Sequence, residues 1–159
     1  MQRWGEPRET VDVDISLFTG FGEVDDYCEV LLEQFEPRIA NAAAFAKERR
    51  VLLLRSRSGV GIDVSLAALP YEALVIQRAS SFNYPRGITL LTCSAEDLIV
   101  LKAFAGRGRD WDDVERVIVR QTGKLDWVYI REQLRPLAEL KDAPEIVDEL
   151  ESRRVEFEQ

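Results

Sequence analysis

The chain has 159 residues, of which 46% are hydrophobic and 31% are charged, and its formal net charge is −8. These values predict one globular domain with a sizeable core, and the negative charge argues against an extended nucleic-acid-binding surface. The sequence contains no histidine, which excludes Ser-His-Asp and Cys-His catalytic triads and histidine-based metal sites.

The first predicted element is a β-strand over residues 8–17, in which apolar and polar side chains alternate. The apolar positions are Val11, Val13, Ile15 and Leu17, and the polar positions are Arg8, Thr10, Asp12, Asp14 and Ser16. Asp12 and Asp14 therefore point the same way, about 6.5–7 Å apart along the strand. Two such carboxylates favour a hard cation such as Mg²⁺, and the alternative is a polar face that simply meets water.

Two helices are predicted next, over residues 24–34 and 41–50. A β-hairpin follows over residues 51–66, because an apolar run and a segment of alternating polarity flank a turn that contains Gly59 and Gly61. In the second arm of this hairpin, Asp63 and Ser65 face away from the apolar positions.

A hairpin packed beside the first strand would bring Asp63 near Asp12 and Asp14. At about 5 Å and an effective dielectric constant of about 20, each pair of like charges costs about 3 kcal/mol without a cation. The three carboxylates therefore indicate a site for a divalent metal and a nucleoside triphosphate.

The remaining predicted elements are a short strand over residues 88–91 and helices over residues 67–79, 95–105, 111–121, 127–140 and 146–154. The predicted fold class is α/β (α+β), with a small mixed β-sheet, flanking helices and a helical C-terminal half. We expect a single domain of residues 1–159, with a sheet-containing part over residues 1–92 and a helical part over residues 93–159.

Lys102 lies within a segment that is apolar nearly all round, so its ammonium group must reach water or pair with an anion. A phosphate or an active-site aspartate is the functional choice of partner. Ser94 and Asp97 fit the start of this helix as a capping pair. Asp110 has two interpretations, as the N-cap of the next helix or as a residue of the site. Arg107 is either a solvated charge or a residue that contacts the ligand.

Cys28 and Cys93 are too few and too far apart in the sequence for a disulfide framework or a zinc site. We expect free thiols in the core and a cytoplasmic protein. No apolar run is long enough to span a bilayer, so no membrane partner is expected.

Three segments together resemble a known family: RWGEPRETVDVD at residues 3–14, GIDVSLA at residues 61–67 and SAEDLIVLKAFAGRGRD at residues 94–110. They are similar to the corresponding segments of AbiEii/AbiGii-type nucleotidyltransferases, which are members of the DNA polymerase β-like superfamily. The resemblance extends to about Leu140. The resemblance depends on three features in this order: the DxD motif at residues 12–14, the distal aspartate Asp63, and the EDLxxxKxxAxRxxD segment at residues 96–110.

The resemblance implies that Asp12, Asp14 and Asp63 bind Mg²⁺ or Mn²⁺, and that Lys102 and Asp110 occupy the family's C-terminal polar positions. Together with these, the candidate substrate-binding residues are Arg8, Thr10, Ser65, Arg107 and Asp110. The family's Gly-Gly or Gly-Ser signature would lie before Met1. We expect either a longer reading frame that encodes it or a protein that has lost this phosphate-binding segment.

The function implied is transfer of a nucleotide from an NTP to a hydroxyl group of RNA or protein, with Asp63 assisting deprotonation and Lys102 holding a phosphate. A toxin with a cognate antitoxin is the cellular role that the family suggests. One alternative is a non-catalytic nucleotidyltransferase-like module that binds a protein partner. Another is a metal-dependent phosphohydrolase.

Overall fold

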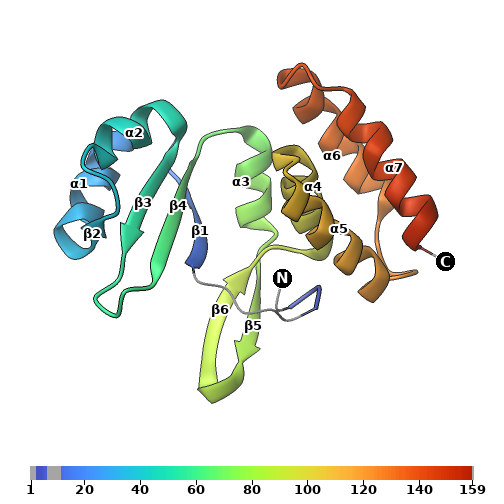
Figure 1. The fold of residues 1–159 in the computed structure, drawn as a ribbon, viewed down its shortest axis with the longest axis horizontal. Coiled ribbons are helices and arrows are strands. Elements are labelled where there is room, and N and C mark those ends of the chain that lie inside the picture. Colours follow the sequence, from blue (N-terminus) through green and yellow to red (C-terminus); the bar gives the residue numbers. More distant parts are fainter. Residues whose placement is uncertain (1–2, 7–11, 159) are drawn as a thin grey trace. The chain divides into compact units, whose positions relative to one another are not determined.

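The computed structural model describes residues 3–6 and 12–158, and it confirms the predicted mixed α/β class (Figure 1). The chain divides into two compact units. In the described part, the first unit comprises residues 12–77, and the second comprises residues 3–6 with residues 78–158. In this part of the chain, no helix combines the length and apolar character needed to cross a membrane.

The first unit is built on a four-stranded sheet with the strand order β1-β4-β3-β2 (Figure 1). Its elements are β1 (Asp12–Phe18), α1 (Val24–Gln34), β2 (Glu36–Pro37), α2 (Ala42–Arg49), β3 (Val51–Arg55), β4 (Gly61–Ala67) and α3 (Pro70–Gln77). β1 pairs with β4 in parallel, whereas β3 pairs in antiparallel fashion with both β2 and β4. The predicted hairpin and the two helices before it are confirmed. Parallel pairing of β1 with β4 requires the long connection that these elements provide.

One face of this sheet packs against α1 and α2, and the other is polar at its centre. The packed face contributes Leu52, Leu54, Val64 and Leu66 to a cluster of buried side chains. Because β1 is an edge strand, its outer apolar residues Val13 and Ile15 stay exposed, and Leu17 packs against the cluster. The predicted apolar face of the first strand is therefore only partly buried.

Arg50 ends α2 in the left-handed conformation, with φ of 58°. Its guanidinium donates hydrogen bonds to the Leu66 carbonyl at 2.9 Å, the Thr19 hydroxyl at 3.0 Å and the Gly20 carbonyl at 2.6 Å. These acceptors come from β4 and from the loop that follows β1. One side chain thus satisfies several carbonyl and hydroxyl groups at the end of the sheet.

The second unit consists of a β-hairpin and a group of helices. Its elements are β5 (Ser80–Tyr84), the 3₁₀ turn η1 (Pro85–Gly87), β6 (Ile88–Thr92), α4 (Ala95–Ala105), α5 (Gly108–Arg120), α6 (Trp127–Leu140) and α7 (Glu145–Phe157). The predictions of α4 and α6 are confirmed. The sequence prediction missed β5 and extended α3 too far in both directions, because Ala67 belongs to β4 and residues 80–84 form a strand.

Residues 3–6 are held against the hairpin and α5 by side-chain hydrogen bonds. Arg3 donates to the Ser80 carbonyl at 3.1 Å and to the Thr92 hydroxyl at 2.7 Å. The Trp4 indole donates to the Cys93 carbonyl at 2.8 Å. The Arg120 guanidinium donates to the Gly5 carbonyl at 2.7 Å. The arginine and tryptophan of the RWG segment therefore have structural partners within the second unit.

Asp97 is a fully buried carboxylate at which three side chains of the second unit meet. Ser94 caps α4 as predicted, because its hydroxyl oxygen accepts from the Asp97 backbone N–H at 3.1 Å, and the hydroxyl donates to Asp97 Oδ2 at 2.9 Å. Arg78 Nε donates to the same oxygen at 3.2 Å, and the Tyr129 hydroxyl donates to Oδ1 at 2.6 Å. Burial and this hydrogen bond raise the pKa of Tyr129. Asp97 thereby joins the start of α4 to α6.

We predict that Tyr129→Phe lowers the free energy of unfolding by about 1–3 kcal/mol, because it removes one donor from a buried carboxylate. Denaturant-induced unfolding measures this change. Tyr84→Phe is the control in the same unit, since the half-buried Tyr84 ring packs against Phe82 and its hydroxyl has no hydrogen-bond partner among the described residues. Equal losses in the two variants would contradict a special role for the Tyr129 hydroxyl.

Candidate functional site

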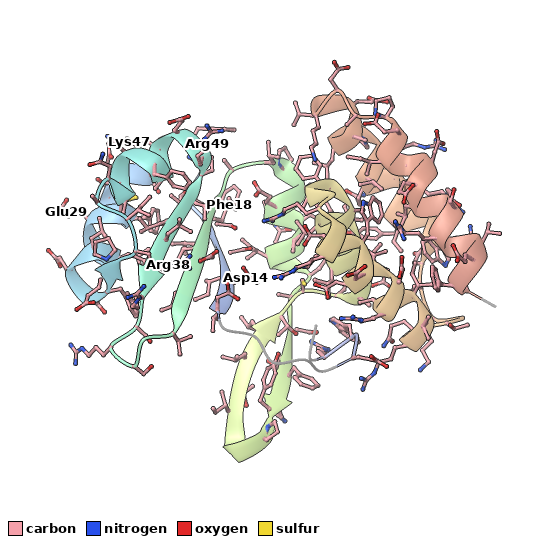
Figure 2. All side chains as sticks on the ribbon, in the orientation of Figure 1. Asp14, Phe18, Glu29, Arg38, Lys47 and Arg49 are labelled. Atoms are coloured by element: carbon pink, nitrogen blue, oxygen red, sulfur yellow. The ribbon has the colours of Figure 1, made fainter. Side chains whose placement is uncertain are left out.

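The strand pairing places Asp63 beside Asp14, which is labelled in Figure 2, on the polar face of the first unit's sheet. In the parallel pairing of β1 with β4, Asp14 pairs with Asp63 and Asp12 pairs with Gly61. Neighbouring strands lie about 4.8 Å apart, and residues two positions apart share a face. Three carboxylates therefore belong to one small area of the sheet, as the sequence predicts.

Arg38 is the functional residue that the sequence analysis missed. It follows β2, and its backbone N–H donates to the Leu53 carbonyl at 3.0 Å. Leu53 pairs with Asp63, so Arg38, Leu53, Asp63 and Asp14 form one row across the sheet. The Arg38 guanidinium reaches along this row and forms an ion pair with Asp63. β2 has only two residues, which is too short for an alternation of apolar and polar side chains. No sequence pattern therefore indicated that Arg38 lies next to Asp63.

Gly61 leaves the space that the Arg38 guanidinium uses. A Cβ atom at position 61 would lie 3.1 Å from Arg38 Nη1 and 3.3 Å from the Asp12 Cβ atom. Both separations are tighter than ordinary van der Waals contacts. The guanidinium and Asp12 therefore flank the same glycine, and any larger residue there would push one of them away.

The donor atoms on this face suit a hard divalent cation. Carboxylates are the oxygen ligands that Mg²⁺ prefers, and Mg²⁺ commonly takes one or two of them and completes its shell with water and substrate phosphates. Within residues 3–6 and 12–158, no three acidic, cysteine or histidine side chains are already arranged to hold a metal. Asp12, Asp14 and Asp63 therefore do not form a metal cage by themselves in this structure.

The other predicted residues of this face divide into two groups. Ser65 lies on β4 two positions after Asp63, is half-buried and pairs with Ser16 of β1. It therefore shares the face of the carboxylates. Arg8 and Thr10 lie outside the described residues.

Lys102 pairs with two aspartates in the second unit, which bears out the expectation that this lysine needs an anion. Its Nζ atom lies 2.9 Å from Asp110 Oδ1 and 3.1 Å from Asp113 Oδ2. The lysine side chain is 24% exposed, and those of Asp110 and Asp113 are 8% and 2% exposed. Burial acts to lower the pKa of Lys102, but the hydrogen bonds to the two aspartates outweigh it and raise the pKa.

The alternative of Asp110 as a helix cap is wrong. α5 begins at Gly108 with Arg107 in the N-cap position, so Asp110 lies inside the first turn. Arg107 is 82% exposed, and its Nε atom lies 3.0 Å from Asp110 Oδ2. The buried carboxylate of Asp113, three residues further along α5, is a second direct partner of Lys102. These residues form a charged cluster that joins α4 to α5.

Comparison of the chain with models of protein families and with curated proteins gives no match. The resemblance described above therefore depends on its motifs alone.

We predict that Lys102→Met lowers the free energy of unfolding by roughly 3 kcal/mol or more, because two nearly buried carboxylates lose the lysine that they share. Adding Asp113→Asn to this variant recovers part of the loss, because one of the repelling charges is removed. Urea unfolding measures both effects. Lys124→Met is the control, since Lys124 is exposed and has no ion pair among the described residues. The structural role of the cluster is refuted if Lys102→Met and Lys124→Met unfold alike.

Proposed function

We propose that this chain is a divalent-metal-dependent nucleotidyltransferase that transfers a nucleotide from an NTP to a hydroxyl group of RNA or protein. The observation that carries the proposal is the pairing of Asp14 with Asp63 on neighbouring strands, with Asp12 on the same face. Like charges opposite one another weaken a sheet. Binding of a cation and a polyphosphate explains why three carboxylates lie together on this face.

In this proposal Asp12, Asp14 and Asp63 hold Mg²⁺ or Mn²⁺. When bound, such a metal would supply positive charge to the triphosphate and to the pyrophosphate leaving group, and would favour in-line attack at the α-phosphorus. Asp63 accepts the proton of the attacking hydroxyl. Lys102, whose ammonium group is raised in pKa and so stays charged, holds a phosphate or the developing charge. Substrate contacts are assigned to Arg8, Thr10, Ser65, Arg107 and Asp110.

The cellular role that we propose is a cytoplasmic toxin with a cognate antitoxin. The motif resemblance to AbiEii/AbiGii-type enzymes supports this role. Two free cysteines, Cys28 and Cys93, agree with a reducing compartment. Burial raises the pKa of the Cys93 thiol to about 11, so it stays protonated at neutral pH and serves no nucleophilic step.

A second candidate is a non-catalytic nucleotidyltransferase-like module that binds a protein partner. The β5–β6 hairpin favours it, because Ile88, Leu90 and Leu91 of β6 are exposed, with Leu91 at 72%. Ile88 and Leu90 share one face of this strand and Leu91 lies on the other, and exposed apolar side chains of this kind can contact a partner. The ion pair of Arg38 with Asp63 also agrees with a sheet that needs no metal.

Melting in the presence and absence of Mg²⁺ tests whether the aspartate face binds a metal. For the unmodified chain we predict stabilisation by Mg²⁺, about 1.4 kcal/mol at ten times the dissociation constant. Asp14→Asn should melt about 1–4 °C higher without metal, because like charges at paired positions are relieved, and should respond little to Mg²⁺. Asp26→Asn, an exposed change on α1, should behave like the parent. Equal responses of all three proteins to Mg²⁺ would remove the basis for a metal site.

The reaction itself is tested with α-labelled NTPs, Mn²⁺ or Mg²⁺, and RNA and protein acceptors. We predict release of pyrophosphate and labelling of an acceptor, and a loss on the order of 100-fold or more in Asp12→Asn, because a metal ligand is removed. Asp26→Asn again serves as the control. Metal binding without any transfer would favour the protein-binding module.

A further inference from the structure

We propose that Arg38 is a phosphate-binding residue that also occupies the metal's place while no metal is bound. In the metal-free chain its guanidinium neutralises Asp63, and when a metal and an NTP bind, it leaves Asp63 and donates to the triphosphate. This inference rests on the proposed function, because it concerns the same aspartate face.

The position of Arg38 places a positive charge among the three aspartates. The residue starts from the β2 side of the sheet, and its side chain crosses β3 above Leu53 to reach Asp63 on β4. Beside it, Gly61 separates the guanidinium from Asp12, with Arg38 Nη1 at 3.1 Å and the Asp12 Cβ atom at 3.3 Å from the position of a Cβ there. Figure 2 labels both Arg38 and Asp14 in this unit. The guanidinium is thus paired with one of the three carboxylates and lies next to the glycine that is paired with Asp12.

The hydrogen-bonding capacity of Arg38 exceeds what its present partner uses. A guanidinium carries five N–H donors in a planar fork, and this geometry matches two oxygens of a phosphate as well as those of a carboxylate. Arg38 Nε is buried and has no hydrogen-bond partner among the described residues. The side chain as a whole is 25% exposed, so part of it is open to solvent.

Because Arg38 and the metal compete for Asp63, binding of the metal is coupled to binding of the nucleotide. A metal that arrives alone must displace the guanidinium from Asp63 and leaves Arg38 without a counter-charge. A metal that arrives with a triphosphate provides that counter-charge, since phosphate oxygens accept the hydrogen bonds that Asp63 gives up. Arg38 therefore disfavours binding of the metal alone and favours binding of the metal with a nucleotide, which is a positive coupling between the two ligands.

Calorimetric titration separates these two effects without any measurement of activity. The proteins are the unmodified chain, Arg38→Gln, Arg38→Lys and Arg49→Gln. Arg49 provides the matched control because it is exposed at the end of α2, where it pairs with Glu48 at 3.1 Å. The ligands are Mn²⁺ alone, and a non-hydrolysable nucleoside triphosphate at saturating Mn²⁺. Circular dichroism establishes that each variant is folded.

We expect Arg38→Gln to bind Mn²⁺ alone about 3- to 10-fold more tightly, because the competing cation is gone. The same variant should bind the triphosphate about 10-fold more weakly, because a bidentate donor is lost. Arg38→Lys keeps the charge without the fork, so it should resemble the parent towards Mn²⁺ and bind the triphosphate with intermediate affinity. It also supplies the test if Arg38→Gln fails to fold. Arg49→Gln should change neither affinity.

Two results would overturn the inference in distinguishable ways. If the unmodified chain binds both ligands and Arg38→Gln or Arg38→Lys binds both as the parent does, or both more weakly, Arg38 only supports the sheet. If the unmodified chain binds neither Mn²⁺ nor the triphosphate, the proposed function fails, and the role of Arg38 fails with it.

Discussion

The parallel pairing of β1 with β4 fixes which side chains meet on the polar face, and the candidate site depends on its register. With Asp14 opposite Asp63, the apolar positions Val64 and Leu66 point to the opposite face, where α1 and α2 cover them. A slip of one residue would turn the aspartates of β1 towards the helix-covered face and its apolar residues towards the carboxylate of β4. The core on one face therefore specifies the arrangement of charges on the other.

An unbalanced pair of aspartates would weaken this sheet, and the fold contains a counter-charge for it. Arg38 comes from an edge segment that pairs with β3, and Gly61 leaves room for its guanidinium on the face. The ion pair with Asp63 balances the charge of one of these carboxylates. Because the pair is partly exposed, its energy is moderate.

The second unit uses buried charge in a different way. Asp97 and the Lys102 cluster lie at the two ends of α4, and each connects this helix to a neighbour through hydrogen bonds with defined geometry. α4 is largely apolar around its circumference, so apolar packing alone would leave its rotation poorly determined. Polar partners on α5 and α6 give it one orientation, at the cost of removing charges from water.

The sequence by itself determined the elements that have a local signal. Alternation and glycines predicted the hairpin of β3 and β4, helical spacing predicted α1 and α4, and Ser94 indicated the start of α4. The polar face of the first strand and the need of Lys102 for an anion also followed from residue pattern alone.

Tertiary structure alone decided the partners. β2 has two residues and no period, so its pairing with β3, and with it the approach of Arg38 to Asp63, arises only when distant segments meet. Asp110 and Asp113 have the spacing of a helix start, and only the packing of α5 against α4 shows that both face Lys102. Local spacing determines which face a side chain occupies, whereas the partner across that face depends on contacts between residues far apart in the chain.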